Sequence, residues 1–285
     1  MPNVPNRGCI RRLGFRSMLA ARTRNIVAVL AIALTTLLFS SLFTVAVAIN
    51  TSYQQENFRQ AGGDYHGTFK GLSLEQVEEL RTDPLIAEDF TRLFVGMPSE
   101  PPFNKSHVEI SYLEPAAAPH YFCDPIEGAL PEEGTNQAAT DTRVLALLGV
   151  EPEIGAEFTV TFDVDILTGH PIPVTRTFTL SGWWEYDEVV VASNILLPRS
   201  AAEELCALSK GEPNTLTGKW NLDVMFEDAM HIEENLLSIL DAHGYQSEEH
   251  MADNYIGIGV NWGYTGAKFA QSMDAGAVLT IVLMS

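Results

Sequence analysis

The hydrophobic pattern of the chain is dominated by one run, residues 26–49 (IVAVLAIALTTLLFSSLFTVAVAI), which has no charge, proline, glycine or amide. As an α-helix, these 24 residues would be roughly 36 Å long, enough to cross a hydrocarbon core of about 30 Å with some tilt. The threonine and serine hydroxyls inside the run can bond to backbone carbonyls one turn earlier, so they are compatible with lipid. The pattern therefore predicts a membrane-spanning helix.

A cleaved signal peptide is the alternative interpretation of the same run. A basic leader precedes it, and Ala46-Val47-Ala48 has the small-x-small pattern that signal peptidase recognises. The apolar core of a signal peptide is usually about 7–15 residues long, which is much shorter than this run. The length favours a retained helix, and cleavage after Ala48 stays the weaker alternative.

A second apolar run closes the sequence. Residues 275–285 carry no charge and stop without a polar tail, so they look like the first half of another spanning helix. We therefore expect the N-terminal part of a longer multi-pass protein. Its expected domains are a cytoplasmic leader (1–25), a membrane helix (26–49), an extracytoplasmic domain (50–274) and the start of a second membrane helix (275–285).

Shorter periodic segments fill the region between the two apolar runs. Residues 50–61 are polar but free of helix breakers, so we expect the spanning helix to continue as a stalk that ends at Gly62-Gly63. The expected elements that follow are, in chain order, a strand (64–69), a helix opened by a Ser73/Gln76 capping box and stopped by Asp83-Pro84, strands (85–95 and 105–113), a long loop (115–134), a helix (142–148) closed by Gly149, strands (157–164, 175–183 and 188–192), a helix (199–209), a strand (220–226), a helix (229–243) followed by a capping Gly244, and a strand (255–262).

This order predicts an α+β fold. A strand–helix–strand unit opens the outer domain and another one ends it, with a β-rich insert between them. We expect the two units to pair into one sheet. Within the insert, 157–164 and 175–183 are expected to form a hairpin around a turn at 168–170.

The charge is divided along the chain. The formal net charge of the chain is −20. Six of the 17 basic residues lie before Asn25, where there are no acidic residues. The rest of the chain contains the other 11 basic residues and all 37 acidic residues, so its net charge is −26. Basic residues flanking a span favour the cytoplasmic side, so the N-terminus is expected inside and the acidic domain outside. An acidic outer domain excludes nucleic acid as a partner, because phosphate would be repelled.

The leader also predicts contact with the lipid bilayer. Residues 10–25 mix arginines with apolar residues and can form a short interfacial helix, with Arg16, Arg22 and Arg24 near the lipid headgroups. An equally good interpretation is that these arginines only fix the topology.

No catalytic, cofactor or metal residues are predicted. The chain lacks a Walker A loop, a G-x-S-x-G elbow and an H-E-x-x-H motif. His120, Cys123 and Asp124 resemble part of a metal site, but no fourth ligand accompanies them, so a solvated loop is the better interpretation. Adjacent carboxylates such as Glu132-Glu133 are expected to be solvated, and the four tryptophans are expected to pack the core. Cys123 and Cys206 can pair or remain unpaired small residues, and we favour the latter.

The sequence resembles the N-terminal part of FtsX-like (MacB-type) ABC transporter permeases. The layout is similar: a leader ending in Arg22-Thr-Arg-Asn25, one span, a large outer domain and a second apolar start. More specific are Gly128-Ala-Leu-Pro131, the segment 138–149 (AATDTRVLALLG) with Ile154-Gly155 before a strand, and 177–184 (TFTLSGWW) returning with a strand that contains a glycine. The segment 136–139 (NQAA) departs from the family pattern of an acid followed by two aliphatic residues, which weakens the strand expected there.

The resemblance implies a permease without enzymatic activity of its own. It would work as a homodimer or paired permease in the plasma membrane, with a separate cytoplasmic ATP-binding subunit. ATP-driven movement of the spans would move the outer domain and so export or extract a peptide or lipid-linked substrate. The alternative is a single-pass membrane sensor whose outer domain binds a ligand.

Overall fold

The computed structural model describes residues 11, 12, 16, 20, 22–98, 100–164, 171–208, 220–247 and 255–264. The chain divides into two compact units, residues 1–53 and 54–285. The expected second span (275–285), the turn at 168–170 and half of the interfacial helix at 10–25 lie outside the described residues.

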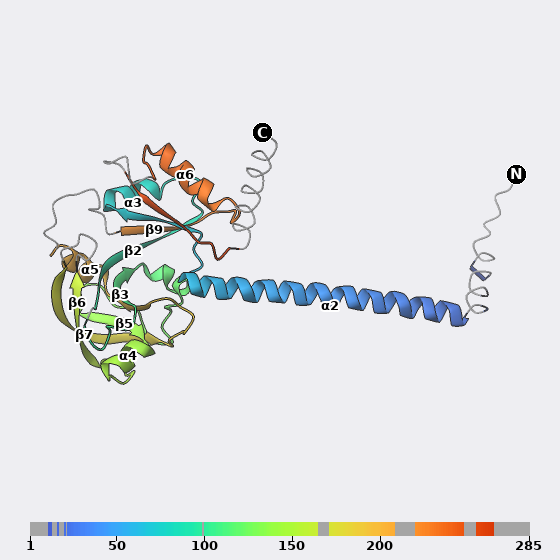
Figure 1. Cartoon of the computed structure of the whole chain (residues 1–285), viewed down its shortest axis with the longest axis horizontal. Helices are drawn as coiled ribbons and strands as arrows, with labels where there is room; N and C mark the ends of the chain where they lie inside the picture. Colours follow the sequence, from blue (N-terminus) through green and yellow to red (C-terminus); the bar gives the residue numbers. More distant parts are fainter. Residues whose placement is uncertain are drawn as a thin grey trace. The chain divides into compact units, whose positions relative to one another are not determined.

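The first unit consists mainly of helix α2, Arg22–Ala61, whose last residues belong to the second unit (Figure 1). None of its residues is buried, and the apolar side chains of the predicted span are about half to two-thirds exposed. Thr35 and Thr36 donate to the carbonyls of Ala31 and Ile32 at 2.7 and 2.8 Å, as the sequence predicts. The helix is therefore long and apolar enough to cross a membrane.

The predicted stalk is confirmed, because α2 continues through residues 50–61 without a break and ends at Ala61. Gly62 has φ +84°, a left-handed conformation that glycine adopts readily and that ends the helix.

In the part of the chain that the structure describes, the second unit is built on one ten-stranded sheet. Its strands are β1 Gly67–Leu72, β2 Glu88–Met97, β3 Val108–Leu113, β4 Glu127–Gly128, β5 Gln137–Asp141, β6 Glu157–Val164, β7 Ile172–Trp184, β8 Ser193–Leu196, β9 Trp220–Met225 and β10 Gly257–Val260. The helices are α3 Leu74–Leu80, the 3-10 helix η1 Pro115–Tyr121, α4 Thr142–Leu148, α5 Arg199–Cys206 and α6 Ile232–Ala242. The fold class is α+β, as predicted.

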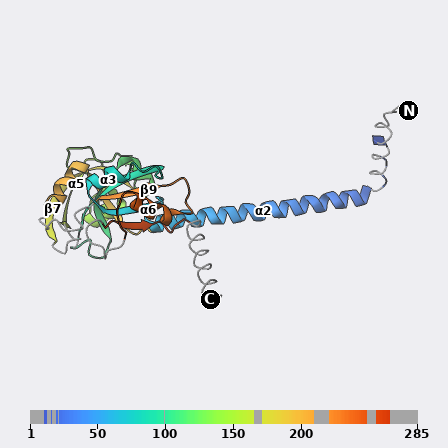
Figure 2. The same ribbon diagram turned by 90° about the horizontal axis from the view of Figure 1, so that it is seen from above.

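The two strand–helix–strand units interleave at one end of the sheet, in the order β10-β1-β9-β2. β1 pairs antiparallel with both β10 and β9, so each unit places a strand between the two strands of the other. Helices α3 and α6 lie side by side over these strands (Figures 1 and 2). Ser73 and Gln76 form the predicted capping box at the start of α3. The predicted pairing of the two halves is confirmed.

The insert closes on itself. From β2 the pairing runs through β3, β8, β5 and β7 to β6, and β6 returns to β2 through the pairs Gly96↔Val164 and Met97↔Asp163. A Cβ atom on Gly96 would lie 2.1 Å from the carbonyl oxygen of Asp163, so only glycine allows this approach. The β6–β7 hairpin has the predicted alternation, with Phe158, Val160 and Phe162 buried.

Two predictions for the insert are wrong in detail, and a third, the weakened strand, is confirmed. Residues 188–192 are not a strand but a turn before β8, which pairs with β3 and β5. The expected loop 115–134 contains η1 and β4. The weak strand at 136–139 does form as β5, because Ala138 and Ala139 are fully buried between neighbouring strands.

The tryptophans contribute to the core, as expected. Trp184 and Trp220 are buried, and Trp183 and Trp262 pack against the main core while remaining partly exposed.

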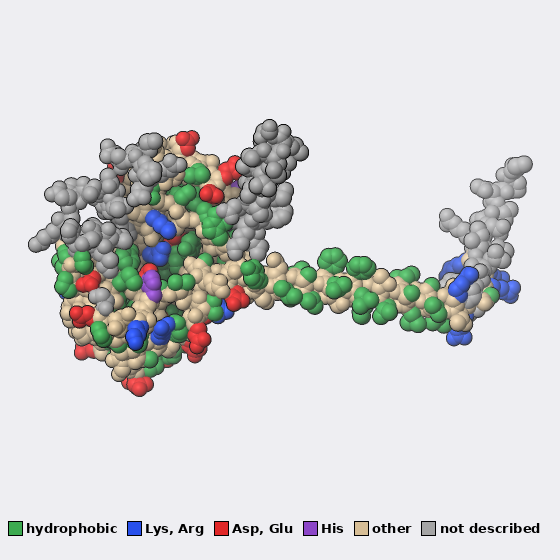
Figure 3. Space-filling model, in the orientation of Figure 1, with side chains coloured by type: hydrophobic (Ala, Val, Ile, Leu, Met, Phe, Trp, Pro, Cys, Tyr) green, Lys and Arg blue, Asp and Glu red, His purple; other side chains and the backbone are tan. Residues whose placement is uncertain are grey.

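Figure 3 shows apolar side chains along α2, basic side chains at its N-terminal end, and acidic side chains spread over the visible face of the second unit.

Candidate functional site

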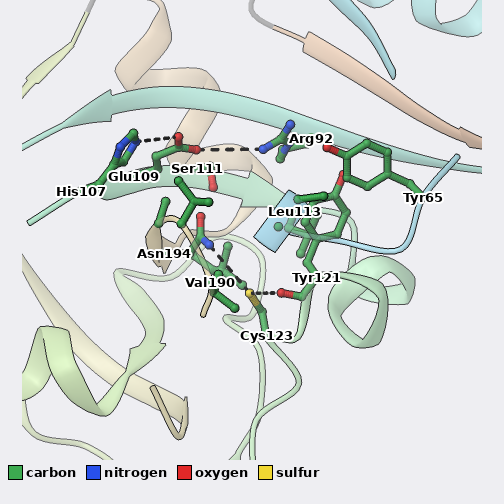
Figure 4. Close-up of a pocket in the computed structure, with 15 residues that line it drawn as sticks. Tyr65, Arg92, His107, Glu109, Ser111, Leu113, Tyr121, Cys123, Val190 and Asn194 are labelled. Carbon is green, nitrogen blue, oxygen red and sulfur yellow. Dashed lines mark hydrogen bonds and ion pairs between the residues drawn. The ribbon is translucent and has the colours of Figure 1, made fainter. Parts of the chain in front are cut away.

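A cavity of about 200 Å³ lies in the second unit. Strands β2 and β3 form one wall and the turn between β7 and β8 forms another (Figure 4). Ala61 and Gly62, at the end of the stalk, also line the cavity. The remaining lining residues are Tyr65, Arg92, His107, Glu109, Ser111, Leu113, Tyr121, Cys123, Val190, Val191, Ala192, Asn194 and Leu196.

A row of ionisable side chains follows β2 and β3 along the cavity (Figure 4). Arg92 Nη1 lies 4.0 Å from Glu109 Oε2, which is an ion pair but too long for a hydrogen bond. The other oxygen of Glu109 lies 3.1 Å from His107 Nε2. Arg92 and Glu109 are both about a quarter exposed, so both remain accessible from the cavity.

A fully buried carboxylate, Asp223 on β9, lies behind Arg92. Its Oδ2 accepts a hydrogen bond from the Tyr121 hydroxyl and lies 3.7 Å from Arg92 Nε. Among the described residues, Asp223 Oδ1 and Arg92 Nε have no hydrogen-bond partner. Such groups are costly to bury.

The cluster holds its arginine charged and its tyrosines neutral. Burial disfavours the charged form of Arg92, but Tyr121, Asp223 and Tyr65 outweigh it and raise the pKa of the guanidinium. Burial and the nearby Asp223 raise the pKa of both Tyr65 and Tyr121. The two rings stack with their centroids 5.3 Å apart, and the Arg92 guanidinium lies over the Tyr121 ring.

Cys123 lines the floor of the cavity but is not a nucleophile. Burial, helped by Asp141, raises the pKa of its thiol to about 12, so the thiol is protonated at neutral pH. Its Sγ donates to the Tyr121 carbonyl at 3.1 Å, and Asn194 Nδ2 approaches it at 3.9 Å. Within the described part of the chain, Cys123 and Cys206 are not joined to each other by a disulfide.

The structure does not bring His120, Cys123 and Asp124 together as ligands. His120 Nδ1 instead lies 2.7 Å from Asp64 Oδ1, and its ring packs on Phe90. The part of the chain that the structure describes contains no group of three or more histidine, cysteine or carboxylate side chains that could hold a metal ion.

Two contacts tie the stalk to the domain near the cavity. Arg59 donates to both oxygens of Asp187, with Nε–Oδ2 at 2.5 Å and Nη2–Oδ1 at 2.7 Å. We call this ion pair the clasp. Asp187 belongs to the turn between β7 and β8, and the same turn supplies Val190 to the cavity wall.

The segments that enter and leave the domain are joined by one buried side chain. Asn261 donates through Nδ2 to the carbonyls of Gly63 and Tyr65 at 2.9 and 2.7 Å, and its Oδ1 accepts from the Gly263 amide at 2.9 Å. Next to it, the rings of Phe58 and Tyr264 lie 4.5 Å apart. The chain therefore leaves the described domain beside the point where the stalk entered it.

Of the predicted interface arginines, Arg22 and Arg24 lie in the first turn of α2, and Arg16 is also exposed. Their contact with lipid stays a prediction. Sequence reasoning missed the cavity residues, and no clear signal was present. Glu109 and Asp223 occupy the polar positions of alternating strands, and the strand that contains Arg92 carries other polar residues as well. Glu133, expected to be solvated, accepts the backbone amides of Arg199 and Ser200 at the start of α5.

Comparison with known proteins gives structural likeness only. No family model and no curated protein matches the chain. The extracellular domain of the ABC-type transporter YknZ from Gram-positive bacteria is similar, with 11% identity and a TM-score of 0.40, over 69% of this chain and 100% of that one. The periplasmic region of MacB from Actinobacillus actinomycetemcomitans is similar too, with 14% identity and a TM-score of 0.40, over 75% of this chain and 94% of that one. Both are parts of the class of transporter that the sequence resembles, but likeness at this level carries no conclusion about activity.

Proposed function

We propose that the chain is the N-terminal part of an FtsX/MacB-type ABC transporter permease. In this proposal the leader (1–25) is cytoplasmic, residues 26–49 span the membrane, residues 50–274 form the extracytoplasmic domain, and 275–285 begin a second span. The permease acts as a homodimer or paired permease with a separate cytoplasmic ATP-binding subunit, and has no enzymatic activity itself.

The observation that carries the proposal is the closure of the domain at Asn261. A domain inserted between two membrane spans has to return its chain close to the place where it left the membrane. The contacts from Asn261 to Gly63 and Tyr65, together with the Phe58–Tyr264 ring pair, meet that requirement. A domain carried on a single span has no need for such a connection.

Two further features support the same role. The arginines before the span and the acidic domain after it favour a cytoplasmic N-terminus. Helix α2 also continues past the apolar run to Ala61 without a break. A continuous helix transmits displacement better than a flexible linker, so movement of the span on ATP binding would reach the domain and drive export or extraction of a peptide or lipid-linked substrate.

The test is to interrupt the stalk. Two glycines inserted after Gln55 are expected to break helical continuity, since each glycine costs about 1 kcal/mol relative to alanine in a helix. In nanodiscs that contain the full-length permease and its ATP-binding subunit, the variant should still hydrolyse ATP. Its extracytoplasmic domain should no longer change its amide hydrogen exchange when ATP is added.

The matched control is the insertion of two alanines at the same position, which adds the same length and rotation but keeps the helix. This control should retain more of the response than the glycine variant. A glycine variant whose domain responds to ATP as the wild type does would contradict a transmitting stalk. If no ATP-binding subunit co-purifies with the full-length protein from its native membrane, the proposal fails in favour of the single-pass sensor.

A further inference from the structure

The cavity carries both signs of charge in one accessible row. We propose that it binds a free α-amino acid with an apolar side chain, whose carboxylate is held by Arg92 and whose ammonium is held by Glu109. This binding site goes beyond the proposed transport role and does not depend on it.

The geometry of the ion pair leaves the charged groups able to form hydrogen bonds with such a ligand. Arg92 lies 4.0 Å from Glu109 and 3.7 Å from Asp223, whereas charge-assisted hydrogen bonds are usually about 2.7–2.9 Å long. The arginine is therefore attracted to both carboxylates without being saturated by either. The hydrogen bond with His107 orients Glu109 toward the cavity side of β3 (Figure 4).

The balance of charge favours a zwitterion over a simple ion. A free anion on Arg92 would also face Glu109 and Asp223, and a free cation on Glu109 would face the permanently charged Arg92. A molecule with one charge of each sign on adjacent carbon atoms satisfies both groups and adds no net charge to the site. An α-amino acid has that arrangement.

The size and the opposite wall define the rest of the ligand. The cavity volume is about 200 Å³, and an apolar protein cavity of about 150 Å³ is known to hold benzene, so a molecule slightly larger than benzene fits. Drug-sized ligands need about 300 Å³ or more. Val190 lies on the wall opposite the charged row, and Leu113 and Leu196 line the cavity from β3 and β8, beside that row, which suits an apolar side chain such as that of leucine.

Calorimetric titration of the full chain in nanodiscs tests the proposal with L-leucine as the probe. L-Leucinamide lacks the carboxylate, and 4-methylpentanoate lacks the ammonium group. Leucine should bind at least tenfold more tightly than either analogue, because each analogue leaves one charged side chain without its partner.

Two variants test which side chain binds which charged group of the ligand. Arg92→Gln should remove the preference for leucine over leucinamide, while Glu109→Gln should remove the preference for leucine over 4-methylpentanoate. Glu109 is partly exposed, so its variant is expected to fold even where the Arg92 variant does not. Glu88→Gln, on an exposed position of β2, is the control and should bind all three molecules as the wild type does.

Filling the cavity gives an independent check. Val190→Trp changes no charge and should abolish leucine binding, because the indole would occupy the side-chain end of the cavity. No leucine binding by the wild type, equal binding of leucine and its two analogues, or unchanged selectivity in the Glu109 variant would each overturn the proposal. None of these results bears on the stalk experiment, so the two proposals fail separately.

Discussion

His66 is a buried residue whose protonation the fold opposes. It is 7% exposed, and its Nδ1 accepts a hydrogen bond at 2.8 Å from the Phe226 amide, which only the unprotonated nitrogen can do. Burial lowers the pKa of His66, while Asp64 and Asp228 act more weakly in the opposite direction. Because the pKa is lower in the folded state than in the unfolded state, the stabilisation is fully present above about pH 6.5 and is lost as the pH falls through the folded pKa.

We therefore predict that the free energy of unfolding decreases from about pH 6.5 toward pH 5, by at most about 1.4 kcal/mol per pH unit from this residue. His66→Asn keeps an acceptor near the position of Nδ1 but does not titrate, so it should remove that part of the pH dependence. The measurement is chemical unfolding of both proteins in detergent, followed by tryptophan fluorescence. Parallel stability curves for wild type and variant across this range would contradict the prediction.

Buried polar and charged residues are the hardest to recognise from sequence. Glu109 and Asp223 occupy the polar positions of alternating strands, and a sequence does not say which face of a strand is exposed once both faces are covered. β3 is an example, because four consecutive residues from Ile110 to Leu113 are buried and the alternation of Val108, Ile110 and Tyr112 no longer separates core from surface. The cavity depends on such two-sided burial and could not be predicted from periodicity.

At the scale of elements, the sequence predicted an element correctly where residues next to it in the chain determine where it begins and ends. The helix 142–148 was predicted with its observed bounds, and Gly149, with φ +69°, ends it as predicted. The structure adds that Asp141 caps its start. The apolar run 188–192 was wrongly predicted as a strand. Its three valines, 189–191, have high strand propensity, but the clasp fixes the turn at Asp187, and β8 pairs only from Ser193.

The clasp gives the prediction at this scale. Arg59 holds the pKa of Asp187 below its ordinary value, first through its hydrogen bond, so the carboxylate is ionised and the ion pair is intact at neutral pH. The pair is partly exposed and bidentate, and we expect it to contribute about 1 kcal/mol. Asp187→Asn should therefore make amide exchange in residues 186–192 about fivefold faster at pH 7.

The control for the clasp is Glu204→Gln, which removes the more exposed ion pair with Arg176. That variant should leave exchange in residues 186–192 unchanged. Hydrogen-exchange mass spectrometry of the full chain in nanodiscs measures both. Unchanged exchange in the Asp187 variant would mean that the turn is held by packing alone and that the clasp does not anchor the stalk to it.

At the scale of the whole molecule, the sequence predicted the order of elements and the pairing of the two halves, but not the closure of the insert. The halves are strand–helix–strand units with strong local periodicity, so their pairing follows from topology rules. The return of β6 to β2 depends instead on a close backbone approach at Gly96, to residues more than 60 positions away. No local pattern marks which of several glycines makes such a contact.

The proposed insertion of the domain between two spans rests on the connection at Asn261, and this connection can be tested by stability. Asn261→Ala removes three hydrogen bonds and leaves the carbonyls of Gly63 and Tyr65 and the Gly263 amide to find other partners. Since Asn261 is 4% exposed, we expect a loss of about 3 kcal/mol. Asn104→Ala, on an exposed segment between β2 and β3, should change stability by less than about 0.5 kcal/mol.

The same variant separates a local role from a connection between the two ends of the domain. If Asn261 joins the ends, amide exchange should accelerate on both sides of the contact, at residues 62–66 and at 261–264, in the full chain in nanodiscs. A purely local role would affect only the turn at 261–264, where the Oδ1 bond to Gly263 lies. Acceleration confined to that turn, with the stalk end protected as in the wild type, would remove the main support for a domain held at both ends by the membrane.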